Sequence, residues 1–377
     1  MLLIAPSLEL PACLSYTLRQ SHDHSVSKSF ETRRIVGSLS HRSALSGELA
    51  SIADGIDTFD VTSHALFAVS DSGALVYRGG AGILSLLTWF DLQGNPAGTI
   101  GDPGPYGYPN VSVDGNRIAI ETGPQGNKDI SILDSSRGGV SNRFIFDPAI
   151  DVAPLWSPDG KNIVFSSNRS GTFDLYIKPA DGSGEEKLLY KSNETKFPNS
   201  FTKDGRFLLF QSEGTSTRND IWALPLKDGG KPITLIQTRY NETGAVVSPD
   251  GRWLAYRSDE SGVTELWVRP FTPDAPAGTG AKWPISNGGV TNEVWSTDSK
   301  ELYYSTVTIQ MMAVDIDAGN GFRAGTPRRL FVGPTQALAT GWDMSSARKR
   351  FLFVAPPSAG HVIPFTVVLN WASALKK

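Results

Sequence analysis

The sequence predicts an all-β fold, a β-propeller of four-stranded antiparallel blades, from three observations. One segment recurs along the chain with a nearly constant spacing. Each copy reads as strand, tight turn and strand, and two further short strands follow it. The chain also contains 38 Gly and 24 Pro among 377 residues, and such a wealth of turn-forming residues suits many short strands.

The recurring segment places an apolar residue and Ser or Thr before an Asp-Gly pair and a second apolar run. Its clearest copies begin at Trp156, Phe201 and Val247, and an earlier copy begins at Val111. With three weaker copies included, the turn position falls at residues 73, 115, 160, 205, 251, 299 and 348. Seven units of about 45 residues fill residues 62 to 377. We therefore expect seven blades, with six as the alternative.

The internal pattern of each copy predicts the strands of one blade. Asp-Gly between apolar runs favours a hairpin, because Gly adopts positive φ without steric cost and Asp bonds its own backbone. A third strand opens at an acidic residue, and a fourth follows, as at Lys187–Tyr190. The acidic residues that open third strands are Asp129, Asp174, Asp220 and Glu265. We expect these residues and the turn Asp to be structural, since they recur in several blades whereas a catalytic residue is needed once.

A sheet of this size buries both faces only against neighbouring sheets, so the blades are expected to stack radially. Tryptophans inside strand patterns are expected in the core between blades, at positions 156, 222, 253, 267 and 295. Residues 46–377 are predicted to form a single propeller domain, and residues 1–45, polar and without period, an N-terminal arm that is disordered or atypical. The last unit is one strand short, and Glu48 to Asp54 is expected to supply it.

Composition excludes several classes of function. With 35 Lys and Arg against 38 Asp and Glu, no basic field is available for nucleic acid. The apolar stretches are shorter than the about 18–20 residues of a membrane span. The single Cys13 excludes an intramolecular disulfide, and the five His show no metal-binding spacing. Kinase motifs and the Gly-x-Ser-x-Gly hydrolase motif are absent from the sequence. We expect a chain that is not an enzyme, with no catalytic residue, metal or cofactor.

The run from Ser157 to Gly171, Ser-Pro-Asp-Gly-Lys-x-Ile-x-Phe-x-Ser-x-Arg-x-Gly, resembles the repeat of TolB-like propellers. The order of the repeats, down to the closing Phe365 to Trp371, also resembles the C-terminal propeller of certain bacterial Ser/Thr receptor kinases, although this chain holds no kinase domain. That resemblance implies a sensory or interaction module outside the cytoplasm. The N-terminus itself has no convincing signal peptide.

By the same analogy, the segments that lead into the first strands ring one end of the central channel, where ligands and peptides dock. They carry carboxylates, a lysine and aromatic side chains that would suit a basic or polar peptide. The candidate binding residues are Tyr106, Tyr108, Asp151, Glu194, Lys196, Tyr240, Glu242 and Glu293. The alternative is that these are solvated loop charges.

The sequence thus predicts a monomeric, non-catalytic module that binds a protein or peptide, with a small molecule as the second choice of ligand. The alternative is a propeller enzyme, a hydrolase, lactonase or lyase, with its active site in the channel. A convergent pair of carboxyl groups with shifted pKa values would favour that alternative.

Overall fold

The computed structural model has two compact units, Ser85–Pro357 and a second that joins Met1–Leu84 to Ser358–Lys377. The structure describes residues 84–124, 127–214, 217–227, 229–273, 280–319, 321–335, 341–345 and 349–357, with short strands at 2–4, 50–53, 58–59, 64–65, 67–69, 74–77 and 366–369. The predicted N-terminal arm, residues 1–45, lies outside the described residues apart from 2–4.

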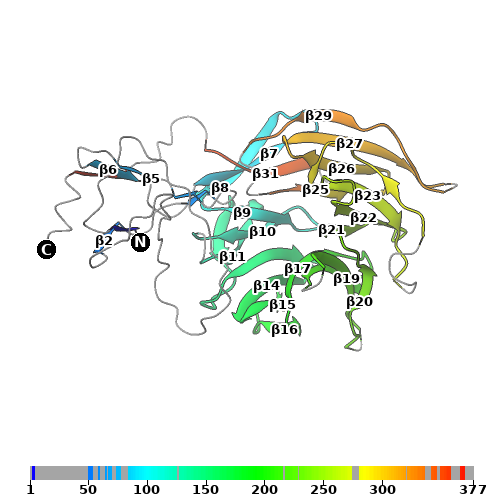
Figure 1. Ribbon diagram of the computed structural model, residues 1–377, viewed down its shortest axis with the longest axis horizontal. Coiled ribbons are helices and arrows are strands. Elements are labelled where there is room, and N and C mark those ends of the chain that lie inside the picture. The colour runs from blue at the N-terminus through cyan, green and yellow to red at the C-terminus, as the bar shows by residue number, and fades with distance from the viewer. Residues whose placement is uncertain are drawn as a thin grey trace, which may run out of the picture. The chain divides into compact units, whose positions relative to one another are not determined.

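The Ser85–Pro357 unit is a six-bladed β-propeller, which confirms the predicted fold class. Each blade is an antiparallel sheet, and successive blades follow the chain from cyan to orange in Figure 1. The first two blades contain β9 (Gly107–Val111), β10 (Arg117–Thr122), β11 (Asp129–Asp134) and β12 (Val140–Arg143), then β13 (Asp151–Trp156), β14 (Asn162–Ser170), β15 (Thr172–Pro179) and β16 (Lys187–Tyr190).

The next three blades repeat this order. They contain β17 (Thr195–Phe201), β18 (Phe207–Glu213), β19 (Asn219–Pro225) and β20 (Ile233–Ile236); β21 (Glu242–Val247), β22 (Trp253–Ser258), β23 (Glu265–Pro270) and β24 (Trp283–Pro284); and β25 (Val290–Trp295), β26 (Glu301–Thr306), β27 (Gln310–Asp317) and β29 (Arg328–Val332). A short β28 (Arg323–Ala324) also pairs with the end of β27 in the fifth blade.

The sixth blade joins distant parts of the chain. Its first two strands are β30 (Trp342–Ser345) and β31 (Arg350–Ala355), and β31 pairs with β7 (Ser85–Phe90), which pairs with β8 (Pro96–Gly104). The expected blade number of seven is therefore wrong, and the alternative of six holds. The strand that closes the last blade is β7 rather than the expected segment from Glu48 to Asp54.

The missing seventh blade is explained by the second unit. The copy of the repeat at residue 73 does form a hairpin, β5 (Phe67–Val69) with β6 (Ala74–Tyr77), but β6 pairs on its other side with β32 (Thr366–Leu369) in a three-stranded sheet. Other strands of this unit pair as β1 (Leu2–Ile4) with β2 (Ala50–Ala53), and β3 (Thr58–Phe59) with β4 (His64–Ala65). The segment expected to close the propeller thus contributes β2 to another sheet.

The first strands of the six blades form a closed ring. Each contacts the first strand of the next blade, and β30 contacts β9 to complete the circle. Six clusters of buried apolar side chains lie one at each interface between neighbouring blades of the described propeller. Trp156, Trp253 and Trp295 belong to these clusters, and the half-buried Trp222 and Trp267 pack against them. The propeller therefore has its core between blades, as radial stacking requires.

The Asp-Gly turns show why the repeat has its sequence. In the second blade the Ser157 hydroxyl donates to Asp159 Oδ1 at 2.6 Å and accepts from the Asn162 amide at 2.9 Å, while Gly160 adopts φ of 66°. The same Ser or Thr to Asp bond occurs in the first and in the third to fifth blades. The Ser157 hydrogen bond is also the main cause that lowers the pKa of Asp159. The turn Asp is thus used structurally.

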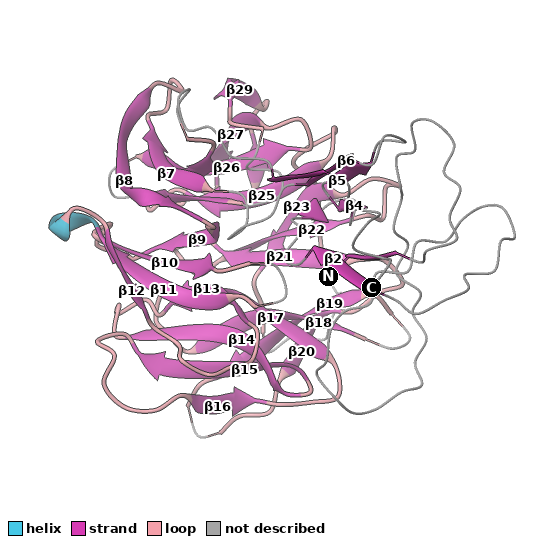
Figure 2. Cartoon of the chain, turned by 90° about the vertical axis from the view of Figure 1, so that its left-hand side faces the viewer, coloured by secondary structure: helices cyan, strands magenta, loops and turns pink. Residues whose placement is uncertain are grey.

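The described residues contain little helix. A short 3-10 helix, η1 (Ser135–Arg137), connects β11 to β12 and is the cyan segment in Figure 2. Within the described part of the chain, no helix is long and apolar enough to cross a membrane.

Candidate functional site

The topology gives the propeller two faces that can be compared with the predicted site. We call the end where the first strands begin the start face, and the opposite end, where Asp-Gly turns join first and second strands, the turn face. Seven of the eight predicted residues lie at or near the beginning of first strands, and hence on the start face, whereas Glu293 is the fourth residue of β25 and lies inside that strand. The two faces differ in what they leave open to solvent.

Burial separates the predicted residues into two groups. Asp151 and Lys196 are 0% exposed, and Glu242 and Glu293 are 1% and 2% exposed. Tyr106 is also buried, and its hydroxyl donates to the Asp102 carbonyl at 2.9 Å. On the solvent side are Tyr108, 54% exposed, and the half-buried Glu194 and Tyr240. The charged side chains expected to meet a ligand thus lie mostly inside the protein.

Lys196 forms a buried ion pair between the second and third blades. Its ammonium lies 2.8 Å from Asp174 Oδ1 and also donates to the carbonyls of Ser192 and Glu194. Asp174 lies near the beginning of β15, the third strand of the second blade, and accepts from the Ser170 hydroxyl at 2.7 Å. Burial alone would raise the pKa of Asp174, but these donors outweigh it and hold its pKa below the usual value. At this interface the Lys196 ammonium therefore compensates the buried charge of Asp174.

Asp151 pairs with an arginine of its own blade. Arg169 Nη2 lies 3.0 Å from Asp151 Oδ1, and the same guanidinium lies within 3.6 Å of Asp147 and Glu186 carboxylate oxygens. It also covers the ring of Tyr176 at 4.6 Å. Burial raises the pKa of Asp151, although hydrogen bonds from Ser167 and Arg169 oppose the rise. The charge of Asp151 is therefore neutralised by Arg169 within the protein, and the carboxylate is not available to a ligand.

Glu242 and Glu293 are buried carboxyl groups on the neighbouring strands β21 and β25. Burial raises the pKa of each to about 7. Arg257 Nε lies 3.0 Å from Glu293 Oε2 and opposes the rise there. Glu242 accepts from the Thr238 hydroxyl at 2.5 Å, while its Oε2 has no partner among the described residues.

The structure brings only part of the predicted set together. Lys196 and Glu194 are bonded through the Glu194 carbonyl, and the Glu194 carboxylate accepts from the Ser212 hydroxyl at 2.6 Å. The Tyr240 hydroxyl accepts from Arg239 Nη2 at 2.8 Å. Tyr108 has φ of 44°, in the left-handed region that a bulky side chain rarely adopts. The buried charges are distributed over successive blade interfaces.

Sequence reasoning missed a recurring polar position on the second strands. Its side chains reach the first strand of the next blade: Glu121 accepts from the Ala153 amide at 2.8 Å, Ser166 donates to the Lys196 carbonyl at 2.7 Å, and Arg257 donates to the Thr291 carbonyl. Each lies six positions after the turn residue, as do Gln211 and Ser305. A polar residue at constant spacing inside an apolar strand was the available signal.

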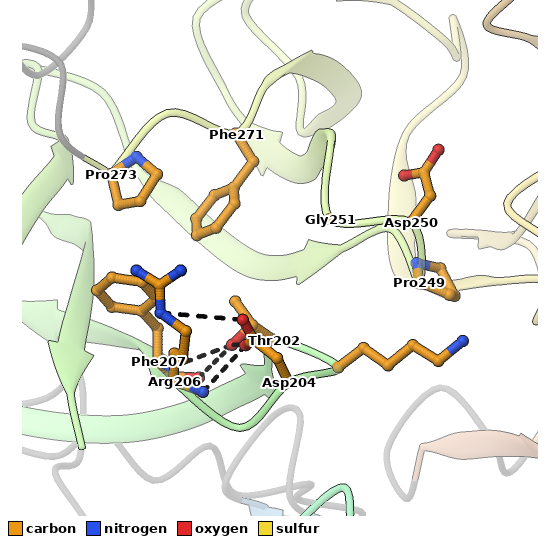
Figure 3. A pocket seen from close by; sticks show the side chains of 10 residues that line it. Thr202, Asp204, Arg206, Phe207, Pro249, Asp250, Gly251, Phe271 and Pro273 are labelled. Atoms are coloured by element: carbon orange, nitrogen blue, oxygen red, sulfur yellow. Dashed lines mark hydrogen bonds and ion pairs between the residues drawn. The ribbon is translucent and has the colours of Figure 1, made fainter. Parts of the chain in front are cut away.

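The turn face carries an open pocket between the third and fourth blades, with a volume of about 470 Å³. Figure 3 shows Phe271 and Pro273 on one side, with Phe207 and Arg206 on the other. Pro249 and Gly251 come from the turn of the fourth blade, and Lys203 and Asp204 from the turn of the third. Asp204 is held by the Thr202 hydroxyl and the Arg206 amide, and these bonds lower its pKa. The pocket therefore combines apolar walls with exposed side chains of both charges, Lys203 and Arg206 beside Asp204 and Asp250.

Comparison with known proteins agrees with this architecture. A family model described as the TolB beta propeller domain matches residues 99–268. The chain is 26% identical over 201 residues to the uncharacterized protein Atu1656 of Agrobacterium fabrum, covering 52% of this chain and 67% of that protein. It is 35% identical over 98 residues to the Tol-Pal system protein TolB of Anaeromyxobacter dehalogenans, covering 26% of this chain and 22% of that protein.

Among solved structures, a putative TolB from Agrobacterium tumefaciens superposes with a TM-score of 0.57 at 17% identity, covering 72% of this chain and 97% of that chain. This likeness concerns the fold. The matched stretches amount to between 12% and 67% of the lengths of the curated relatives.

Proposed function

Because the chain carries a TolB-type β-propeller domain, we propose that it is a non-catalytic module that binds a protein partner through an extended peptide segment. The observation that supports this proposal is the turn-face pocket, whose apolar walls and charged rim come from two neighbouring blades. The start face offers less, since its charged side chains are buried and paired or hydrogen bonded within the protein.

The side chains that line the pocket indicate which kind of peptide segment would bind there. The rings of Phe207 and Phe271, with centroids 6.3 Å apart, offer apolar surface for an aromatic or aliphatic anchor. Lys203 and Arg206 are exposed, so they can attract carboxylates without a large desolvation cost. Asp204 and Asp250 contribute two opposing charges, but each carboxylate accepts hydrogen bonds from its own turn, Asp204 from Thr202 and Arg206, and Asp250 from Ser248 and Arg252. The segment that fits is a short acidic peptide with an apolar anchor.

The test is fluorescence anisotropy with two labelled peptides, one carrying Asp and Glu around a Phe and a counterpart with Lys in place of each acid. We expect the acidic peptide to bind more tightly and to lose affinity in Phe271→Ala and in Arg206→Ala. The matched control is Tyr108→Ala, which removes an exposed aromatic from the start face and should leave affinity unchanged. Loss of binding in the Tyr108 variant alone would mean that the peptide binds at the start face. Equal binding of both peptides would refute the proposal that the pocket selects an acidic segment.

A finer proposal is that this module is the sensor part of a receptor kinase. It rests on the resemblance of the repeat order and of the closing Phe365 to Trp371 to the propellers of such kinases. The neighbouring reading frame provides the test, since a kinase domain and a membrane segment encoded directly upstream would support it, and an unrelated gene would oppose it.

A propeller enzyme is the second candidate, and the raised pKa values of Glu242 and Glu293 favour it, because general acids and bases need values near neutrality. Screening ester, lactone and polyuronide substrates tests this candidate. If the wild-type chain turns over a substrate and both Glu242→Gln and Glu293→Gln abolish that turnover, the enzyme candidate would be supported over the binding proposal. Turnover that persists in both variants would assign the activity elsewhere.

A further inference from the structure

The repeat makes it possible to compare one structural position across several blades. Nine positions before the turn residue, near the beginning of each first strand, the chain has Asp151, Lys196, Glu242 and Val290 in the second to fifth blades. In the blade that precedes each, the acidic residue at or near the beginning of the third strand is Asp129, Asp174, Asp220 and Glu265 respectively. Each of these four blade interfaces therefore has an acidic group that needs a donor or a cation.

Three of these interfaces satisfy the acidic group from within the chain. Asp129 pairs with Arg143 at 2.7 Å, and Asp174 pairs with Lys196 at 2.8 Å. Glu265 accepts from the Ser286 hydroxyl and from the Gly289 amide, the latter at 3.1 Å. The position opposite Glu265 is the apolar Val290, so no second charge is added there. Asp151, the carboxyl group at the position opposite Asp129, pairs with Arg169 at 3.0 Å, so each carboxyl group at these three interfaces is compensated.

The interface between the third and fourth blades differs. Asp220 is 2% exposed and accepts through Oδ2 from Thr217 and Gln237 at 2.6 and 3.0 Å, but its Oδ1 has no partner among the described residues. Glu242, 1% exposed, stands where Lys196 stands in the preceding blade, and its Oε2 is likewise unpartnered. Gln237, which donates to Asp220, is followed directly by Thr238, which donates to Glu242, so the two carboxyl groups lie near one another. Burial raises the pKa of Glu242, and the charge of Asp220 adds to the rise. The nearby Asp259 and Glu260 already pair with Arg218 and Lys282.

We propose that Asp220 and Glu242 bind a divalent cation between the third and fourth blades, at the place where the preceding interface holds the Lys196 ammonium. The net charge of the two carboxylates indicates a divalent rather than a monovalent cation. One carboxylate and one ammonium are neutral at the Lys196 interface, whereas two carboxylates need two positive charges. The ligands are all oxygens, and Ca²⁺ fits a buried oxygen site better than Mg²⁺, which retains its waters, or Zn²⁺, which prefers nitrogen and sulfur.

The test is thermal unfolding of the full chain at pH 8 after dialysis against EDTA, with CaCl₂, MgCl₂ or NaCl added at equal ionic strength. We expect Ca²⁺ to raise the Tm by several degrees and the rise to grow with the logarithm of its concentration. Glu242→Gln should abolish the rise. Glu242→Lys should raise the Tm without Ca²⁺ and remove the response, because it installs the cation of the preceding interface.

The matched control is Glu213→Gln, which removes an exposed carboxylate from the third blade and should keep the full response. Isothermal titration with CaCl₂ provides a second measurement that does not depend on unfolding. A wild-type chain that neither shifts its Tm nor releases heat with Ca²⁺ would overturn the proposal. So would an equal response in Glu242→Gln, because the cation would then bind elsewhere.

Discussion

Replacing Lys196 by Met tests whether an ion pair at the start face stabilises the contact between two blades. Both partners are fully buried, with Lys196 Nζ and Asp174 Oδ1 separated by 2.8 Å. Met keeps an unbranched side chain of similar length, so the substitution removes the ammonium with little change in packing. What remains is a buried carboxylate without its cation.

The magnitude follows from that remaining group. Removing one partner of a buried ion pair costs about 3–5 kcal/mol, because the other charge stays desolvated. Asp174 keeps its bonds from the Ser170 hydroxyl and the Ser192 amide at 2.7 and 3.2 Å, so the lower half of that range is expected. Exposed Lys203 provides the control, since Lys203→Met should change the free energy of unfolding by less than about 0.5 kcal/mol.

The pH dependence separates lost charge from lost packing. In the wild-type chain the pKa of Asp174 is lowered, so its contribution to stability is present above the unfolded pKa of about 3.9 and is lost as the pH falls below it. Without Lys196 burial raises that pKa, and the carboxyl can become neutral in mild acid. The difference between variant and wild type should therefore be largest at pH 7 and shrink toward pH 4.

Urea unfolding followed by tryptophan fluorescence, repeated between pH 4 and pH 7, measures this difference. A loss below about 1 kcal/mol at pH 7 would refute the reasoning, because it would mean that Asp174 is solvated after the substitution. A large loss that does not change with pH would also refute it, since packing rather than charge would then be responsible.

Three further predictions concern other parts of the propeller. Trp156→Phe should cost about 1 kcal/mol, because Trp156 Nε1 donates to the Asn110 carbonyl at 3.0 Å; Trp222→Phe, whose Nε1 is unpartnered, should be nearly neutral by the same urea titration. Burial raises the pKa of Glu293 from 4.5 to about 7, so the free energy of unfolding of the wild-type chain should fall by up to about 3 kcal/mol as the pH rises from about 4.5 to 7. In thermal scans over this pH range, the Glu293→Gln variant should show a smaller fall. Deleting residues 85–104 removes β7 and β8, and circular dichroism should then show no cooperative unfolding; a retained sharp transition would contradict the closure described above.

The fold could be predicted because the signal that repeats is itself structural. Asp-Gly after Ser or Thr specifies a hairpin through bonds such as Ser157 to Asp159, so the period counts hairpins. It does not count sheets, and this is why the blade number was one too high. The copy at residue 73 forms a hairpin outside the propeller, while the turn between β7 and β8, at Asp91 to Asn95, has no Asp-Gly pair to mark it.

The site was harder to predict because burial depends on partners that are distant in sequence. Lys196 looks like a loop charge until Asp174, twenty-two positions earlier, is placed beside it. Asp151 depends in the same way on Arg169 of the neighbouring strand. The turn-face pocket was not expected either, because Phe207 and Phe271 belong to different blades and each reads as an ordinary strand residue.

The period contains more information when it is used to compare blades than when it is used to count them. A position that repeats with the same environment but a changing side chain shows what that environment requires. Beside the acidic residues of the third strands, an arginine of the same blade, a lysine of the next blade, or a hydroxyl and an amide meet this requirement at three interfaces. Glu242 adds a second carboxyl group beside Asp220, as Asp151 does beside Asp129, but Arg143 and Arg169 pair with Asp129 and Asp151. No cation pairs with Asp220 or Glu242 among the described residues, and a buried carboxyl pair of this kind is costly unless a proton or a cation is shared. The departure of this one interface from the repeat is therefore the reason to examine it for a bound ion.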